Sequence, residues 1–120
     1  MDIQINDLPY DIYDSDRKIR YFTKNGKFFF KVNLYLTGMD LPFVENVTYF
    51  LHKSFPTPQR WVHRSLSNQH CILTMWAWGK FEVRTIVKDT KGNGFSYNHF
   101  LNFDSHFYDK GVEFVKVIRK

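Results

Sequence analysis

Apolar and polar residues alternate along this chain in short segments that are separated by turn residues. The pattern is clearest at residues 47–52, where Val47, Tyr49 and Leu51 are each separated by one residue, the period of a half-buried β-strand. No long window keeps a helical period, so the pattern predicts an all-β chain. Segments rich in β-branched and aromatic residues are found at 18–23, 27–37, 45–52, 61–66, 70–75, 80–88, 95–103 and 111–118.

Two short polar segments between these strands predict tight reversals of the chain. Asn25 and Gly26 favour a type I′ hairpin turn, because that turn needs a positive φ at both central residues. Lys91–Gly94 contains two glycines and predicts a second reversal. Seven to eight strands in a chain of 120 residues favour an antiparallel, immunoglobulin-like β-sandwich.

Charge is distributed unevenly between the first sixteen residues and the rest. Residues 1–16 carry five Asp and no Lys or Arg, so we expect an acidic N-terminal arm there and one sandwich domain at 17–120. The arm fits a flexible tail, an edge strand or a lid. The domain holds 17 Lys and Arg against 7 Asp and Glu (12 minus 5), a net charge of +10. This charge is consistent with three alternatives. The domain binds an anionic partner, the acidic arm folds back over a basic face of the domain, or the surface is simply solvated and kept soluble by its like charges.

The remaining composition indicates a soluble intracellular protein. Aromatic residues make up 19% of the chain, and much of that content must be core. Cys71 is the one cysteine, which rules out an intramolecular disulfide and fits a reducing compartment. The first residues show no secretory signal, and no apolar run is long enough to span a membrane, so we expect no membrane partner.

Residues with catalytic or metal-binding chemistry are present but do not form a recognisable site. His63, His70 and Cys71 match no zinc spacing, because adjacent residues of a strand point to opposite faces. Cys71 lies in an apolar, strand-like run, where a thiol is usually inert packing. His52 and Ser54 resemble a nucleophile and its base, but no nucleophile elbow accompanies them. We therefore predict no catalytic residue, no metal and no cofactor.

Two aromatic segments do not fit a plain core. Phe55 leaves a strand end on a loop braced by Pro56, and it can serve as a lid on the core or as a ligand wall. Trp76 and Trp78 share a side-chain direction if the segment is extended, and Gly79 allows another group to approach the backbone. Basic and aromatic surface also suits nucleic acid, although the Lys and Arg are scattered singly along the chain.

These two segments resemble the motifs of the YEATS family. Leu51–Arg60 is similar to the family's His-x-Ser-Phe-Pro-x-Pro-x-Arg run, and Trp78–Phe81 is similar to its aromatic–small–x–Phe run. Phe100–Phe103 resembles a later family strand, and the likeness covers about residues 28–105. The Trp76–Gly79 segment and the short loops are more similar to those of prokaryotic YEATS-like domains than to those of nuclear ones. The resemblance implies an immunoglobulin-like reader of acylated lysine, without catalysis.

Carried over by position, the resemblance implies a slot for a flat acyl group. Phe55 and Trp78 would be its two walls, and Phe81 would line its floor. The Ser54 hydroxyl and the backbone N–H groups around Trp78 and Gly79 would hydrogen-bond the ligand's amide.

Three further residues complete the predicted slot. His52 would orient Ser54, Phe28 would also line the slot, and Ala77 stands where the family usually has Gly, which narrows the backbone approach.

The resemblance also implies a partner, an acylated-lysine protein or peptide. Asn98 stands where nuclear members carry an acidic residue, and with the net charge of +10 over 17–120 this disfavours a basic histone tail. The alternative is a prokaryotic YEATS-like sensor or adaptor that contacts another protein or nucleic acid through its basic face. The expected compartment is the cytoplasm of a prokaryote, or the nucleus if the chain is eukaryotic.

Overall fold

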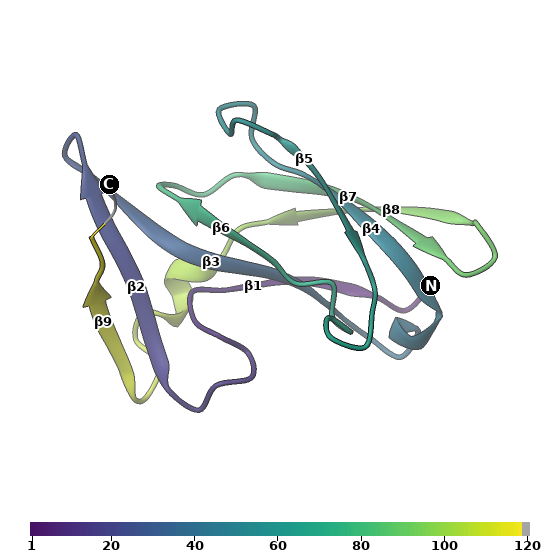
Figure 1. Ribbon diagram of the computed structural model, residues 1–120, viewed down its shortest axis with the longest axis horizontal. Coiled ribbons are helices and arrows are strands. Elements are labelled where there is room, and N and C mark those ends of the chain that lie inside the picture. Colours follow the sequence, from purple (N-terminus) through teal and green to yellow (C-terminus); the bar gives the residue numbers. More distant parts are fainter. Residues whose placement is uncertain (119–120) are drawn as a thin grey trace. The chain divides into compact units, whose positions relative to one another are not determined.

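The computed structural model describes residues 1–118 of the chain, and in them nearly all regular structure is β (Figure 1). Two short 3-10 helices, η1 (Leu41–Phe43) and η2 (Phe103–His106), join the strands. The strands are β1 (Gln4–Leu8), β2 (Arg17–Lys24), β3 (Lys27–Thr37), β4 (Val44–Phe50), β5 (Gln59–His63), β6 (Leu73–Ala77), β7 (Glu82–Asp89), β8 (Gly94–Phe100) and β9 (Val112–Lys116).

The strands form two hydrogen-bonded sheets. One has the order β1-β3-β2-β9, with β6 also paired to β3, and the other has the order β5-β4-β7-β8. This confirms the predicted all-β, immunoglobulin-like sandwich. One detail differs from the prediction: β9 pairs with β2 in parallel. β1, within residues 1–16, stands at the end of its sheet's strand order, which is the edge-strand alternative for the N-terminal arm. The division of the chain at residue 16 stays a prediction.

The local sequence pattern explains where strand β3 begins and ends. β3 has the bounds expected from its apolar run, and the turn before it has φ of 54° at Asn25 and 75° at Gly26, as a type I′ turn requires. The strand predicted at 70–75 is wrong at its start, because β6 begins at Leu73. Cys71 has a φ of 50°, a left-handed conformation that breaks an extended strand.

The described chain divides into two units, each with its own buried residues. The first unit contains residues 1–6, 34–73 and 81–101, and β4 and β7 each contribute three of its buried side chains. Tyr49 and Cys71 are fully buried there, and the Tyr49 hydroxyl donates to the carbonyl of Cys71 at 2.8 Å. The Tyr49 hydroxyl thus gives the buried Cys71 carbonyl a hydrogen-bond partner.

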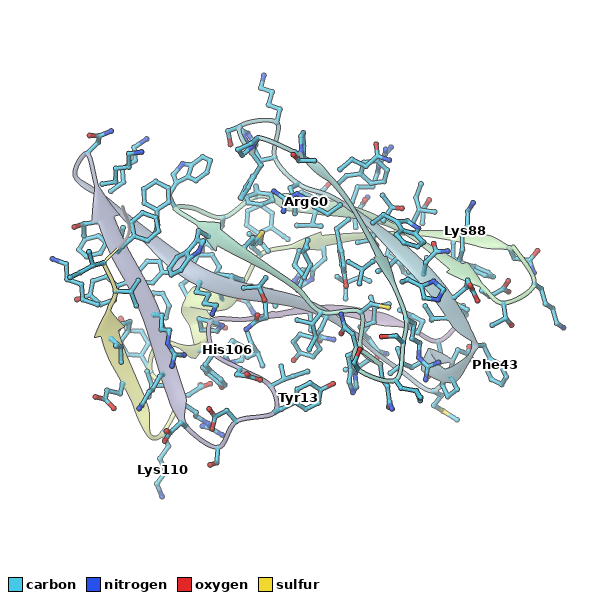
Figure 2. All side chains as sticks on the ribbon, viewed as in Figure 1. Tyr13, Phe43, Arg60, Lys88, His106 and Lys110 are labelled. Carbon is cyan, nitrogen blue, oxygen red and sulfur yellow. The ribbon has the colours of Figure 1, made fainter. Side chains whose placement is uncertain are left out.

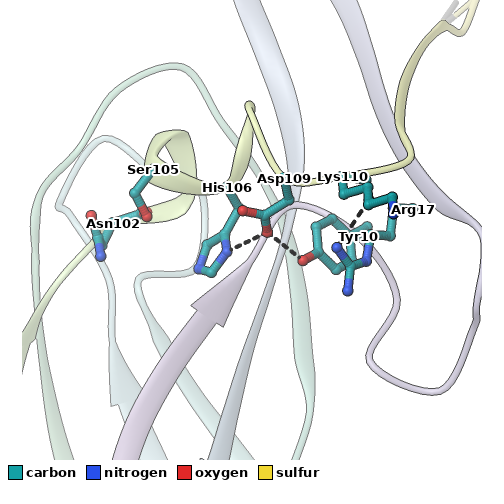
Figure 3. A network of polar contacts seen from close by, with 7 residues as sticks. All are labelled: Tyr10, Arg17, Asn102, Ser105, His106, Asp109 and Lys110. Carbon is teal, nitrogen blue, oxygen red and sulfur yellow. Dashed lines mark hydrogen bonds and ion pairs between the residues drawn. The ribbon is translucent and has the colours of Figure 1, made fainter.

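The second unit contains residues 7–33, 74–80 and the described residues from 102 onward. A polar network in it joins the loop after β1 to the loop before β9 (Figure 3). The Asp109 carboxylate accepts hydrogen bonds from the Tyr10 hydroxyl at 2.7 Å and from Nδ1 of His106 at 2.8 Å. The hydrogen bond from Tyr10, followed by that from His106, lowers the pKa of Asp109.

The described residues contain neither a helix that could span a membrane nor a group of side chains that could hold a metal ion. None of the helices in residues 1–118 has the length and apolar character needed to cross a membrane. Within the same residues, no three His, Cys, Asp or Glu side chains are grouped so that they could hold a metal ion.

Candidate functional site

The loop between β4 and β5 is closed by its own backbone. The N–H of Leu51 donates to the carbonyl of Pro58 at 2.8 Å, and the N–H of Phe55 donates to the carbonyl of His52 at 3.0 Å. Arg60, labelled in Figure 2, donates from Nε to the carbonyl of Thr57. Because proline restricts φ and cannot donate, the two prolines of this loop stiffen it further. The loop is thus a rigid support for the residues at its tip.

His52 and Ser54 form a defined hydrogen-bonded pair in this loop. The His52 Nδ1 and the Ser54 Oγ are 2.7 Å apart, and the backbone N–H of Ser54 donates to the same nitrogen at 3.2 Å. A backbone N–H can only donate, so these two contacts together fit the tautomer in which Nδ1 is the accepting nitrogen. The Ser54 hydroxyl therefore also donates to Nδ1, and its oxygen keeps lone pairs that can accept a hydrogen bond.

Phe55 and Phe81 pack beside this pair within the first unit. The ring centroids of Phe55 and Phe81 are 5.5 Å apart, and those of His52 and Phe81 are 5.9 Å apart. Phe55 is 8% exposed, and the carbonyl of Phe81 accepts the N–H of Leu101 at 3.1 Å. Four predicted site residues, His52, Ser54, Phe55 and Phe81, thus lie together in one cluster.

Trp78, Ala77 and Gly79 belong to the second unit. Trp78 directly follows β6 and is 38% exposed, whereas Ala77 is fully buried. The space that a Cβ would occupy on Gly79 is open, because apart from its chain neighbours no described atom lies within 4 Å of that position. The centroid of the Trp78 ring is 5.8 Å from that of Phe29 on β3.

The aromatic surroundings of Trp78 were missed by the sequence analysis. Phe22 and Phe29 are cross-strand partners in the β2–β3 hairpin, and their rings stack at 4.8 Å. The Trp76 ring contacts Phe22 at 4.9 Å, so a row of aromatic rings connects Trp76 to Trp78. Part of this row could have been predicted from the sequence, because a two-residue turn at Asn25–Gly26 fixes an antiparallel register that places Phe22 opposite Phe29.

Phe28 lies in a different group of rings from Trp78. Adjacent strand residues point to opposite faces, and Phe29 is the one that contacts Trp78. Phe28 is 55% exposed and lines an apolar groove of about 320 Å³. The other side chains that line this groove are Tyr21, Phe30, Phe107 and Phe114. That Phe28 lines the slot stays a prediction.

Comparison with known sequences identifies relatives of one kind. The sequence profile of the prokaryotic YEATS domain matches residues 30–102. Transcription initiation factor TFIID subunit 14 of Schizosaccharomyces pombe is 31% identical over 75 residues, which cover 62% of this chain. The chain spans about 30% of the length of that relative.

Comparison with solved structures gives the same fold. The Yaf9 YEATS domain recognising the H3K122suc peptide matches with a TM-score of 0.57 and 16% identity, over 84% of this chain and 70% of that chain. The crystal structure of Yaf9, the yeast AF-9 homolog, matches with a TM-score of 0.51 and 20% identity, over 62% and 51% respectively. At these identities the likeness concerns the fold.

Proposed function

Because this chain belongs to the prokaryotic YEATS domain family, we propose that it is a non-catalytic recognition module that binds an acylated lysine or a similar flat acyl group. In this proposal the acyl group lies in a slot with Phe55 and Trp78 as walls. The membership itself confirms the family expected from the motifs at 51–60 and 78–81.

The observation that carries the proposal is the hydrogen-bonded pair of His52 and Ser54. An acyl-lysine side chain ends in a neutral amide, which needs a hydrogen-bond partner when it leaves water. With its proton directed at His52 Nδ1, the Ser54 oxygen suits the amide N–H as an acceptor. Backbone N–H groups at Trp78 and Gly79 would donate to the amide carbonyl.

The aromatic residues would supply the rest of the binding energy. A flat acyl group between the Phe55 and Trp78 rings would gain about 0.5–1.5 kcal/mol beyond the area that it buries. Phe81 would line the floor, as its contact with Phe55 at 5.5 Å supports. Phe28 and Ala77 remain proposed slot residues from the family likeness.

Selectivity for acylated over free lysine would follow from the neutral chemistry of the slot. A bare ammonium group would lose its hydration and find no carboxylate among the proposed slot residues. The Yaf9 structure described as recognising the H3K122suc peptide supports a modified-peptide partner for a domain of this fold. The net charge of +10 over residues 17–120 favours a partner less basic than a histone tail.

Titration with peptides tests this function directly. Acetyl-lysine, crotonyl-lysine and unmodified lysine peptides on the same backbone would be titrated against the native chain and Trp78→Ala. We expect binding of acylated peptides only, with a loss of about tenfold or more in Trp78→Ala because one wall is removed. Mass spectrometry of the recovered peptide should show no chemical change.

A matched control separates the slot from general aromatic surface. Trp61 on β5 is 61% exposed, and Trp61→Ala should leave every affinity as in the native chain. If Trp78→Ala binds acylated peptides as well as the native chain while its circular dichroism is unchanged, the slot does not exist. Binding of duplex DNA that weakens steeply with salt, without any peptide binding, would instead favour the adaptor function.

A further inference from the structure

A small pocket in the second unit is lined by three cations. Lys18 and Arg20 reach it from β2 and Lys31 from β3, and its volume is about 110 Å³. All three side chains are half-buried. Lys and Arg are mostly exposed in proteins, and like charges that share a partly buried cavity repel one another. The arrangement is unfavourable by itself and becomes favourable when an anion occupies the cavity.

The backbone explains why these side chains share one cavity. The β2–β3 ladder ends at the pair Tyr21 and Phe30, and Arg20 and Lys31 are the next residues on each strand. Beyond the hairpin the two strands diverge, as Figure 1 shows, so the pocket lies where they separate. Lys18, two residues before Arg20, is on the same face of β2.

Among the described residues, two of the three cations of the pocket have no carboxylate partner. Within residues 1–118, neither Arg20 nor Lys31 forms an ion pair. Lys18 lies 3.6 Å from an Asp16 carboxylate that is itself exposed. One carboxylate, that of Asp11, lines the pocket, and one of its oxygens accepts the N–H of Tyr13 at 2.9 Å. The lining therefore keeps a net charge of two positive.

Two polar side chains hold the wall of the pocket in a defined position. Asn33 donates from Nδ2 to the carbonyl of Tyr10 at 3.1 Å, and its Oδ1 accepts the hydroxyl of Thr74 at 2.7 Å. The Asn33 amide carries a second hydrogen, which would donate to a ligand in the pocket. A wall fixed by hydrogen bonds binds a small ligand with less loss of conformational entropy.

We propose that this pocket binds the terminal phosphate group of a small soluble molecule. A phosphate monoester carries a charge of about −1.5 to −2 near neutral pH and three acceptor oxygens, which matches three converging cations. The Arg20 guanidinium would bind two of these oxygens, and Lys18 and Lys31 would act as point charges. The volume of about 110 Å³ suits one phosphate group, with the organic part of the molecule outside the pocket.

Thermal shift and calorimetry with inorganic phosphate test the proposal. The native chain would be compared with Arg20→Gln, Lys31→Gln and the control Lys88→Gln, which removes an exposed cation from β7 (Figure 2). Sodium chloride at matched ionic strength controls for screening. We expect phosphate to raise the Tm of the native chain and of Lys88→Gln, and both pocket variants to bind it about tenfold more weakly or worse. Without phosphate, the pocket variants should melt at or above the native Tm, because repulsion is relieved.

Two results would overturn this assignment. The first is a Tm shift that phosphate produces equally in all four proteins, or that sodium chloride produces at the same ionic strength. Either outcome would show general screening of charge instead of a phosphate site. The second is tight binding of duplex DNA that phosphate does not compete for, which would make the cations part of a nucleic-acid surface. The proposal does not depend on the acyl-lysine slot, since Trp78→Ala should bind phosphate like the native chain.

Discussion

The contact with His52 leaves the Ser54 oxygen as a hydrogen-bond acceptor in the proposed slot, and this role can be tested. Its backbone N–H and its hydroxyl both point to Nδ1 of His52, at 3.2 and 2.7 Å. In the proposed slot, this oxygen would accept a hydrogen bond from the ligand. Removing it in Ser54→Ala should raise the Kd of an acylated peptide about five- to thirtyfold, the equivalent of about 1–2 kcal/mol, as calorimetry would measure.

The matched control for this hydroxyl lies in another loop of the same unit. Ser65 and Ser67 share an exposed hydroxyl contact at 3.1 Å, and Ser67→Ala should leave peptide binding unchanged. Ser54→Thr retains the oxygen and should recover part of the lost affinity. Native affinity in Ser54→Ala would mean that the hydroxyl does not contact the ligand.

Strand β1 is held beside the end of β3 by a turn that only glycine can form. Gly38 has a φ of 134°, and a Cβ built there would lie 2.2 Å from the carbonyl oxygen of Asp2. Next to this contact, the N–H of Asp2 donates to Asp40 Oδ2 at 2.6 Å, and the N–H of Met39 donates to Asp2 Oδ2 at 3.1 Å. The N-terminal segment is thus attached by several polar contacts that a side chain at position 38 would push apart.

Gly38→Ala should therefore lower the free energy of unfolding by about 2 kcal/mol or more, since backbone strain and a backbone clash add. Urea denaturation measures this. Gly92→Ala is the matched control, because Gly92 has a φ of 86° with nothing within 4 Å of its Cβ position. It should lose only about 1 kcal/mol from strain. If both variants lose the same free energy of unfolding, the Asp2 carbonyl does not restrict the side chain at position 38.

Elements with a strong local signal could be predicted from the sequence, and elements stabilised by distant contacts could not. The apolar run of β3 and the Asn25–Gly26 turn carry their signal within a few residues, so their positions were correct. β1 has a weak alternation, and its pairing with β3 depends on the turn at Gly38. The start of β6 was placed too early because the left-handed backbone of Cys71 leaves no trace in its apolar pattern.

The site shows the same division between local and distant information. The family motifs led to His52, Ser54, Phe55 and Phe81, which lie within contact of one another in the first unit. The Phe22–Phe29 pair follows from the local β2–β3 hairpin, but the aromatic row also needs Trp76 and Trp78, which are about fifty residues away in the sequence. The groove that contains Phe28 likewise needs Phe107 and Phe114 from the C-terminal part of the described chain. Only the folded chain reveals these clusters.

For the molecule as a whole, Cys71 is a probe of cooperative unfolding. Its side chain is fully buried, and burial raises the pKa of its thiol from 9.0 to about 11. Since the thiolate is the reactive form, the native thiol is protected both by exclusion of reagent and by its protonation. Labelling of Cys71 therefore reports opening of the first unit.

We expect this opening to coincide with global unfolding, because the boundary between the two units falls inside β1, β3 and β6. Labelling of Cys71 by a thiol reagent in increasing urea should have the same midpoint as the loss of far-ultraviolet circular dichroism. Labelling that is complete well below that midpoint would mean that the first unit opens separately.

The same thiol should make stability fall at alkaline pH. The unfolded thiol ionises near 9.0 and the native thiol near 11, so the native state holds this proton more tightly. Its contribution is complete below about pH 9 and is lost as the pH rises from 9 to 11. Other groups titrate in this range, so the measurement is the difference between the native chain and Cys71→Ala in urea denaturation across pH 8 to 11. The free energy of unfolding of Cys71→Ala should fall less over this range than that of the native chain. If the two free energies fall in parallel with pH, Cys71 has the same pKa in the folded and unfolded states.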